Sequence, residues 1–244
     1  MKNTSIITTS IIAVAVIVAG YFLGKNYRDR SRAPHSIEVT GLAEKNFTSD
    51  LIVWNGSFSK SNKDMKQASN DLKQDVEKVK AFLAAQNVPE KEIQFSAVQI
   101  NREYQTVYND DGSSRSEFTG YRLTQNVKIE SKNIKLIEKV SRDISKLIDD
   151  GVEFYSDAPM FLYTKLADLK LQLIEEATKD ATARAEKIAQ NSGSSIRRLM
   201  QGDMGVFQIT ARYSDEDYSW GGAFNTSSVE KTASITVHLV FEVK

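Results

Sequence analysis

The 244-residue sequence predicts an α+β fold: mixed, largely antiparallel sheets packed with three helices and preceded by one N-terminal membrane segment. Runs rich in β-branched and aromatic residues open and close the folded part of the chain, which is typical of strands. Three longer stretches place apolar residues at steps of three and four, which indicates amphipathic helices. Residues 6–23, by contrast, are uncharged and apolar on every face.

The apolar segment at residues 6–23 is predicted to be a transmembrane anchor or a signal segment. As a helix, 18 residues extend about 27 Å, close to the thickness of a bilayer core. Val18 and Gly20 are small enough for a signal cleavage site, but Tyr21 and Phe22 continue the apolar run, which favours an anchor. Four basic residues follow the segment and one precedes it, so the positive-inside rule by itself favours a cytoplasmic body.

Charge and cysteine content exclude several classes of function. Residues 1–33 hold five basic side chains and one acidic side chain, which leaves 27 basic and 31 acidic residues in 34–244, a net charge of −4. A mildly acidic body does not attract phosphate backbones, so no nucleic-acid partner is expected. The sequence has no cysteine, which excludes thiol catalysis, zinc ribbons, disulfides and a cysteine-linked lipid.

The chain is expected to hold a single folded domain at 37–244. A tail at 1–5 precedes the apolar segment, and residues 24–36, which are polar and basic and contain Pro34, form a short tether. β-Rich runs bounded by turn residues predict the strands of the domain. The expected strands are 37–41, 51–58, 93–108, 117–130, 152–163 with an interruption near Pro159, 196–200, 206–211 and 235–243.

The expected helices span 61–87, 133–150 and 165–191. The first has an apolar seam at helical spacing, with lysine, glutamine, aspartate and glutamate on its other faces, and Pro89 stops it. Gly151 ends the second helix. Between the first two helices, the Asp-Gly pair at Gly112 indicates a hairpin.

The third helix carries alanine at every fourth position and is followed by Gly193. Small residues along one ridge let a helix approach its packing partner closely. The alternative is a helix simply filled with good helix formers. The predicted helix-packing ridge comprises Ala177, Ala181, Ala185 and Ala189.

The long polar loop at 213–228 contains several large aromatic residues, which are costly to expose unless they pack on something. They either fold back onto their own domain or form a contact with another subunit or partner. The candidate interface residues are Tyr213, Tyr218, Trp220 and Phe224. Asp215 and Asp217 suggest a calcium loop, but Trp220 and Thr226 stand where the EF-hand pattern needs glycine and glutamate.

Several short motifs, taken in order, resemble the SIMPL-domain family of envelope proteins, which includes periplasmic immunogenic and oxidative-stress-related proteins. Ile37-Glu-Val-Thr-Gly41 is similar to the opening strand of the family. Asp50-Leu51-Ile52 is similar to its second strand, although Ser49 replaces a common proline. Gly120-Tyr121-Arg122, the four-spaced alanines and the closing valine-rich strand also match, and the resemblance covers 37–244.

The resemblance implies a mixed α/β structure and an exported or membrane-anchored protein, against the charge rule at the N-terminus. It implies self-association, because at least one member of the family forms a ring- or channel-like homo-oligomer. It supplies no catalytic residue.

No residue pattern in the chain indicates a catalytic or metal centre. His35 lies in the tether, and His238 lies on the solvent face of the last strand, so neither has a second imidazole or a cysteine beside it. No glycine-rich phosphate loop occurs. We therefore expect no enzyme activity and no cofactor.

The leading functional hypothesis is a non-enzymatic envelope protein that self-associates and is linked to stress tolerance. We expect it to be anchored in the inner membrane through residues 6–23, with its domain in the periplasm or outside, or else to be cleaved and periplasmic. The alternative function is a small-molecule or peptide-binding module of the cell envelope, whose ligand the sequence does not identify.

Overall fold

A computed structural model describes residues 17–22, 35–110 and 112–244. Residues 17–22 are helical, and Ile17, Tyr21 and Phe22 are exposed. In these described ranges, no helix has both the length and the apolar character needed to span a bilayer. The rest of the predicted membrane segment at 6–23, and all of the tether except residues 35 and 36, lie outside the described residues.

The described chain forms two compact units. Of the described residues, unit 1 comprises those up to 42, 176–205 and 236–244, and unit 2 comprises those within 43–175 and 206–235. The strands β1 (Ser36–Thr48) and β10 (Glu230–Val243) and the helix α5 (Leu166–Asn191) contribute residues to both units. The domain predicted at 37–244 is therefore built from two compact parts.

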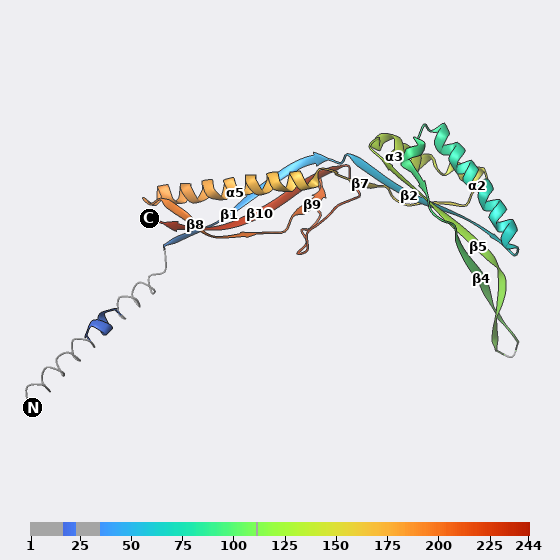
Figure 1. The fold of residues 1–244 in the computed structure, drawn as a ribbon, viewed down its shortest axis with the longest axis horizontal. Coiled ribbons are helices and arrows are strands. Elements are labelled where there is room, and N and C mark those ends of the chain that lie inside the picture. The colour runs from blue at the N-terminus through green and yellow to red at the C-terminus, as the bar shows by residue number, and fades with distance from the viewer. Residues whose placement is uncertain (1–16, 23–34, 111) are drawn as a thin grey trace, which may run out of the picture. The chain divides into compact units, whose positions relative to one another are not determined.

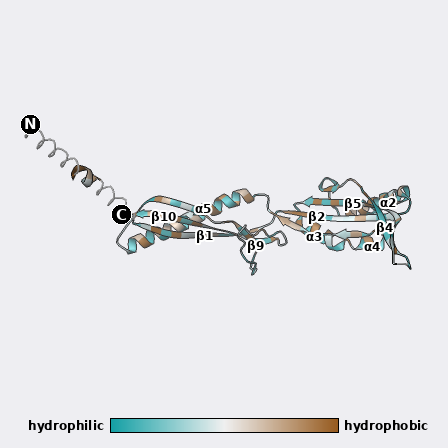
Figure 2. Ribbon diagram, turned by 90° about the horizontal axis from the view of Figure 1, so that it is seen from below, coloured by the Kyte–Doolittle hydropathy of each residue, from teal (hydrophilic) through white to brown (hydrophobic). Residues whose placement is uncertain are grey.

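Unit 1 is a sheet with one helix along it (Figure 1). β10 pairs antiparallel with β8 (Ile196–Met204), from Val237 opposite Met204 to Val243 opposite Ile196, and β1 is its other neighbour. Alternate residues of β10 and β1 are buried, which follows from the two-residue period of a strand. Figure 2 shows that α5 carries both hydrophilic and hydrophobic residues along its length, as expected for a helix with one buried face.

Unit 2 is built on a six-stranded sheet in which β2 (Leu51–Asn62) and β5 (Ser114–Ser131) are central. These two strands pair antiparallel without a bulge, from Ile52 opposite Ser131 to Asn62 opposite Tyr121. β3 (Ile93–Phe95) and β4 (Gln99–Tyr108) lie beside β5. Two short strands, β6 (Phe154–Ser156) and β7 (Met160–Leu162), lie beside β2. The free end of the β4–β5 hairpin extends away from the helices of this unit (Figure 1).

Helices cover one face of the unit 2 sheet. α2 (Met65–Ala85) begins at Asp64, whose side chain accepts a hydrogen bond from the Gln67 backbone N–H at 2.9 Å, as N-caps do. α3 (Ile134–Asp143) begins in the same way at Asn133. The core beneath these helices is apolar and fully buried at its centre, with Ile52, Trp54, Phe58, Val79, Leu83, Val127, Ile129 and Ile137 as its main members.

Four α-helices rather than the expected three occur in the described parts of 37–244. The helix predicted at 133–150 stops at Asp143 and resumes as α4 (Lys146–Asp149). The backbone N–H of Leu147 donates to the Ile144 carbonyl at 3.0 Å, a three-residue step that tightens the turn and interrupts the α-helical ladder. After this interruption Leu147 is buried, whereas Ile148 is exposed.

Strand boundaries also differ from the predictions. The run at 93–108 is divided into β3 and β4, whereas the interruption expected near Pro159 is present and separates β6 from β7. The closing strand starts earlier than expected, at Glu230, and β9 (Gln208–Ala211) pairs with its first residues. The antiparallel α+β class itself is confirmed.

Candidate functional site

The loop that follows β9 in unit 2 presents large aromatic side chains to solvent. Trp220 is fully exposed at 100% and Tyr213 is 89% exposed. Tyr218 and Phe224 are exposed at 64% and 57%. The four candidate interface residues therefore do not fold into the core of their own unit, which was the alternative open from the sequence.

Hydrogen bonds from the Gln208 side chain fix the shape of this loop. Its Oε1 accepts from the backbone N–H of Ala223 at 2.7 Å and of Ser219 at 3.2 Å. Its Nε2 donates to the Ser219 carbonyl at 2.9 Å. One amide side chain thus satisfies three backbone groups of a loop that has few of its own partners. Sequence reasoning missed Gln208, because nothing local to it indicates a role in a segment eleven residues further on.

Two further features restrict the loop. Glu216 accepts from the Ala211 backbone N–H at 3.0 Å and from the Asn225 side chain at 2.5 Å. Gly222 has a φ of +93°, and a Cβ at this position would lie 2.7 Å from the Phe207 carbonyl oxygen, so only glycine fits. The aromatic side chains are therefore exposed on a backbone held by its own unit.

Two of the aromatic residues also have local contacts. The Arg212 guanidinium lies 4.6 Å from the centre of the Tyr213 ring, within the range of a cation–π contact. The Tyr218 hydroxyl lies 3.4 Å from the Ser234 hydroxyl. These contacts orient the side chains and leave most of each ring uncovered.

The alanine ridge of α5 lies in unit 1 and is buried along its whole length. Ala177, Ala181, Ala185 and Ala189 are each at most 1% exposed. The closest approach is to Gly41 of β1, where a Cβ would lie 2.1 Å from the Ala177 carbonyl oxygen and 2.6 Å from the Ala181 backbone nitrogen. The ridge therefore faces its own sheet, and small residues on both elements permit the contact.

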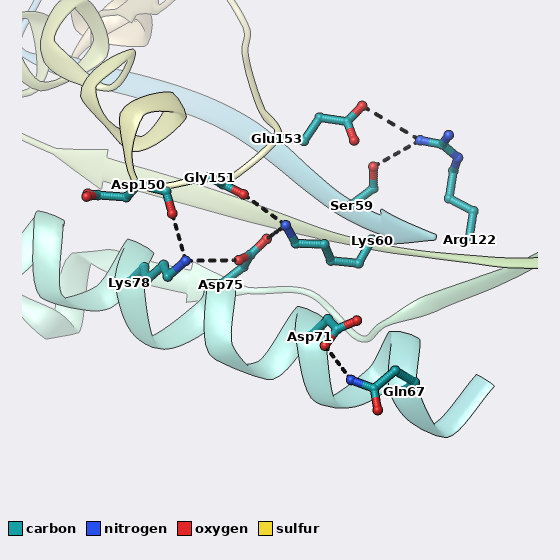
Figure 3. Close-up of polar contacts among 10 residues, drawn as sticks. All are labelled: Ser59, Lys60, Gln67, Asp71, Asp75, Lys78, Arg122, Asp150, Gly151 and Glu153. Atoms are coloured by element: carbon teal, nitrogen blue, oxygen red, sulfur yellow. Dashed lines mark hydrogen bonds and ion pairs between the residues drawn. The ribbon is translucent and has the colours of Figure 1, made fainter. Parts of the chain in front are cut away.

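Unit 2 contains a buried carboxylate that sequence reasoning missed (Figure 3). Asp75 is 1% exposed, and its two oxygens lie 3.1 Å from Lys60 Nζ and 3.9 Å from Lys78 Nζ. Each lysine also donates to a backbone carbonyl in the turn after α4, Lys60 to Gly151 at 2.9 Å and Lys78 to Asp150 at 2.7 Å. This cluster links α2, β2 and that turn, and its role is structural.

Lys231 is a second buried charge in unit 2. It is 2% exposed, and its Nζ donates to the carbonyl oxygen of Phe161, a neutral partner. Burial lowers the pKa of Lys231 below its ordinary value of 10.5, because an ammonium group loses hydration in an apolar environment. Phe47, Leu162 and Phe224 are among the residues around it.

The pKa of Lys231 predicts a pH dependence of stability. The unfolded chain binds this proton more tightly than the folded chain, so the free energy of unfolding should rise with pH between the lowered pKa and 10.5. Lys231→Met should lose this contribution. Urea unfolding followed by fluorescence of the buried Trp54 between pH 7 and pH 10 measures the difference between wild type and variant; a difference independent of pH would contradict the prediction.

The histidines do not form a site with other titratable groups. His238 lies on β10, where its Nδ1 is 3.3 Å from the Thr40 hydroxyl. No group of three or more histidine, cysteine, aspartate or glutamate side chains suited to a metal ion occurs within 17–22, 35–110 and 112–244. Asp215 and Asp217 are exposed on the aromatic loop.

The fold and these surfaces define a mixed α+β protein whose antiparallel sheets carry helices, with an exposed aromatic loop as its most conspicuous candidate site. The SIMPL family, described as a protein of unknown function (DUF541), matches residues 37–241, and the chain belongs to this family. No curated protein matches the sequence. The resemblance inferred from the strand and helix motifs is thereby confirmed.

Proposed function

We propose that this protein is a non-enzymatic component of the cell envelope that self-associates through the aromatic loop of unit 2. The observation that carries the proposal is the combination of full exposure and fixed backbone at this loop. Trp220 is 100% exposed, while Gln208 and Glu216 hold the backbone on either side of it. Tyrosine and tryptophan supply much of the binding energy at protein interfaces, and an ordered loop loses little entropy on binding.

Membrane attachment is the second part of the proposal. The uncharged run at 6–23 has the length and composition of a membrane anchor, and the basic residues after it suit the lipid headgroup region. The SIMPL resemblance favours placing units 1 and 2 on the periplasmic or outer side. Cell fractionation with protease accessibility tests this placement, and digestion only after the cytoplasm is opened would contradict it.

A role in stress tolerance rests on the family resemblance alone. Comparing survival of a deletion strain and its parent after peroxide exposure tests it. A strain in which expression is restored serves as the control. Equal survival of the deletion strain and its parent would remove this part of the proposal and leave self-association unaffected.

Self-association predicts that substitutions in the loop lower the native mass. Full-length protein in detergent should sediment as an oligomer, and Tyr218→Ser together with Trp220→Ser should shift it toward the monomer, because the apolar area buried between copies is lost. Tyr108→Ser is the matched control, since Tyr108 is 77% exposed elsewhere in unit 2. A monomeric wild type, or an unchanged mass in the loop variant, would overturn the proposal.

A further inference from the structure

The face of the unit 2 sheet opposite the helices carries polar side chains. Figure 3 shows the side chains of Ser59 and Lys60 on opposite sides of β2, with Lys60 turned toward α2. The strand pairing places Ser57 opposite Asn126 and Asn55 opposite Lys128, and these residues alternate with the buried core residues of β2 and β5. They therefore share the open face with Ser59.

At one end of this face the polar groups pair with one another. Arg122 Nε lies 2.5 Å from Glu103, and its Nη1 lies 3.1 Å from the Ser59 hydroxyl and 3.9 Å from Glu153. The Tyr155 hydroxyl donates to Glu153 at 2.6 Å. The Arg122 hydrogen bond lowers the pKa of Glu103, so this carboxylate is ionised and paired. This end needs no further partner.

At the other end polar side chains surround a hollow of about 440 Å³, and four of them lack a partner among the described residues. The hollow is lined by Asn55, Ser57, Gln94, Asn126, Lys128 and Asp157, among others. In the part of the chain that the structure describes, the side chains of Asn55, Ser57, Gln94 and Asn126 make no hydrogen bond to protein. Its volume falls within the usual range of small-molecule sites, roughly 300–1,000 Å³.

The chemistry of this lining selects a class of ligand. Each amide side chain offers two donors and one acceptor oxygen, and the serine hydroxyl both donates and accepts. Lys128 lies 2.5 Å from Glu130, which offsets its charge, so the carboxylate of Asp157 leaves the lining unfavourable to anions. A neutral molecule rich in hydroxyl groups, which likewise donate and accept, matches these groups best.

An exposed aromatic ring lies beside the hollow. Tyr155 is directly opposite Ser57 in the strand pairing and is 57% exposed, with its hydroxyl held by Glu153. A tyrosine fixed by its polar end presents an apolar ring face, which suits the C–H face of a sugar ring. From this juxtaposition we propose that the hollow on the open face of unit 2 binds a neutral glycan. The proposal concerns a surface other than the aromatic loop and does not depend on self-association.

Binding can be tested with defined oligosaccharides. Full-length isotope-labelled protein, solubilised in a detergent without a sugar headgroup, is titrated with maltotetraose, cellotetraose and N-acetylchitotetraose, which differ in linkage and substituent. At least one saccharide should shift the amide resonances of Asn55, Ser57 and Asn126 saturably. No shift with any of the three would overturn the proposal, as would saturable binding of tetraserine peptide in place of the saccharides.

Variants locate the site. Gln94→Ala with Asn126→Ala should weaken saccharide binding about tenfold or more, because each amide removed leaves ligand hydroxyls unpaired. Gln99→Ala is the matched control: Gln99 is an exposed amide on the same face, opposite Thr124, and outside the hollow. Unchanged fluorescence of Trp54 shows that each variant is folded. Equal affinity of the double variant and the control would overturn the assigned location.

Discussion

Gly41→Val should destabilise unit 1 by about 3 kcal/mol or more, at the upper end of the cost of overpacking a core. A Cβ at Gly41 would lie 2.1 Å from the Ala177 carbonyl oxygen and 2.8 Å from the Ala181 Cβ. The nearest atoms belong to the helix backbone, which cannot rotate aside as a long side chain can. The whole of α5 would have to move off β1, which would open gaps along the buried alanine ridge.

Hydrogen exchange locates this effect in the chain. Amides of residues 177–189 in unit 1 should lose protection in Gly41→Val, whereas amides of α2 in unit 2 report whether the damage spreads. Gly221→Val is the matched control, because nothing lies within 4 Å of a Cβ added there. Wild-type protection at 177–189 in the Gly41 variant would show that the close contact between α5 and β1 is not required.

The contact between Gly41 and Ala177 shows how much of the packing in unit 1 can be predicted from the sequence pattern. The four-residue alanine spacing predicts a close helix approach, and the two-residue period of β1 places Val39 and Gly41 on one face. Both predictions depend only on residues that are close together in the sequence, so they can be made without knowledge of the tertiary structure. Which strand meets the ridge is a matter of chain topology, and it follows only once β1 and α5 are placed in the same unit.

The division into two units has no local signal of this kind. β1, α5 and β10 each continue without a break through residues assigned to both units, so no linker, glycine run or change in composition marks a boundary. The interruption between α3 and α4 could not be predicted either, because Ile144 and Ser145 are not helix-breaking residues such as glycine or proline.

The candidate sites, like the fold, could be predicted from the sequence only in part. Composition located the aromatic loop, but exposure of Trp220 depends on the Gln208 hydrogen bonds across the loop. The hollow around Asn126 joins residues from several strands and cannot be read from one segment. Asp75 could have been found from the sequence. It stands three residues after Leu72 and four before Val79, which places a carboxylate on the buried seam of α2.

Lys60→Met should lower the free energy of unfolding of unit 2 by about 2 kcal/mol, because it leaves the Asp75 carboxylate buried without its nearer cation. The expected loss is below the about 3–5 kcal/mol typical of a broken buried pair, since Lys78 remains 3.9 Å away and Lys60 is itself partly exposed. The Gly151 carbonyl also loses its donor. Urea unfolding followed by Trp54 fluorescence measures the change.

Two comparisons test whether the stability lost in Lys60→Met comes from the burial of the Asp75 charge or from the loss of an ion pair as such. Arg142→Met removes an ion pair of the same 3.1 Å length, but with both side chains well exposed, and should cost less than about 1 kcal/mol. Adding Asp75→Leu to Lys60→Met should recover most of the lost stability, because no uncompensated charge then remains in the core. If the double variant were as unstable as Lys60→Met alone, the cost would lie in the lost contacts of the lysine, and the buried charge of Asp75 would not be its source.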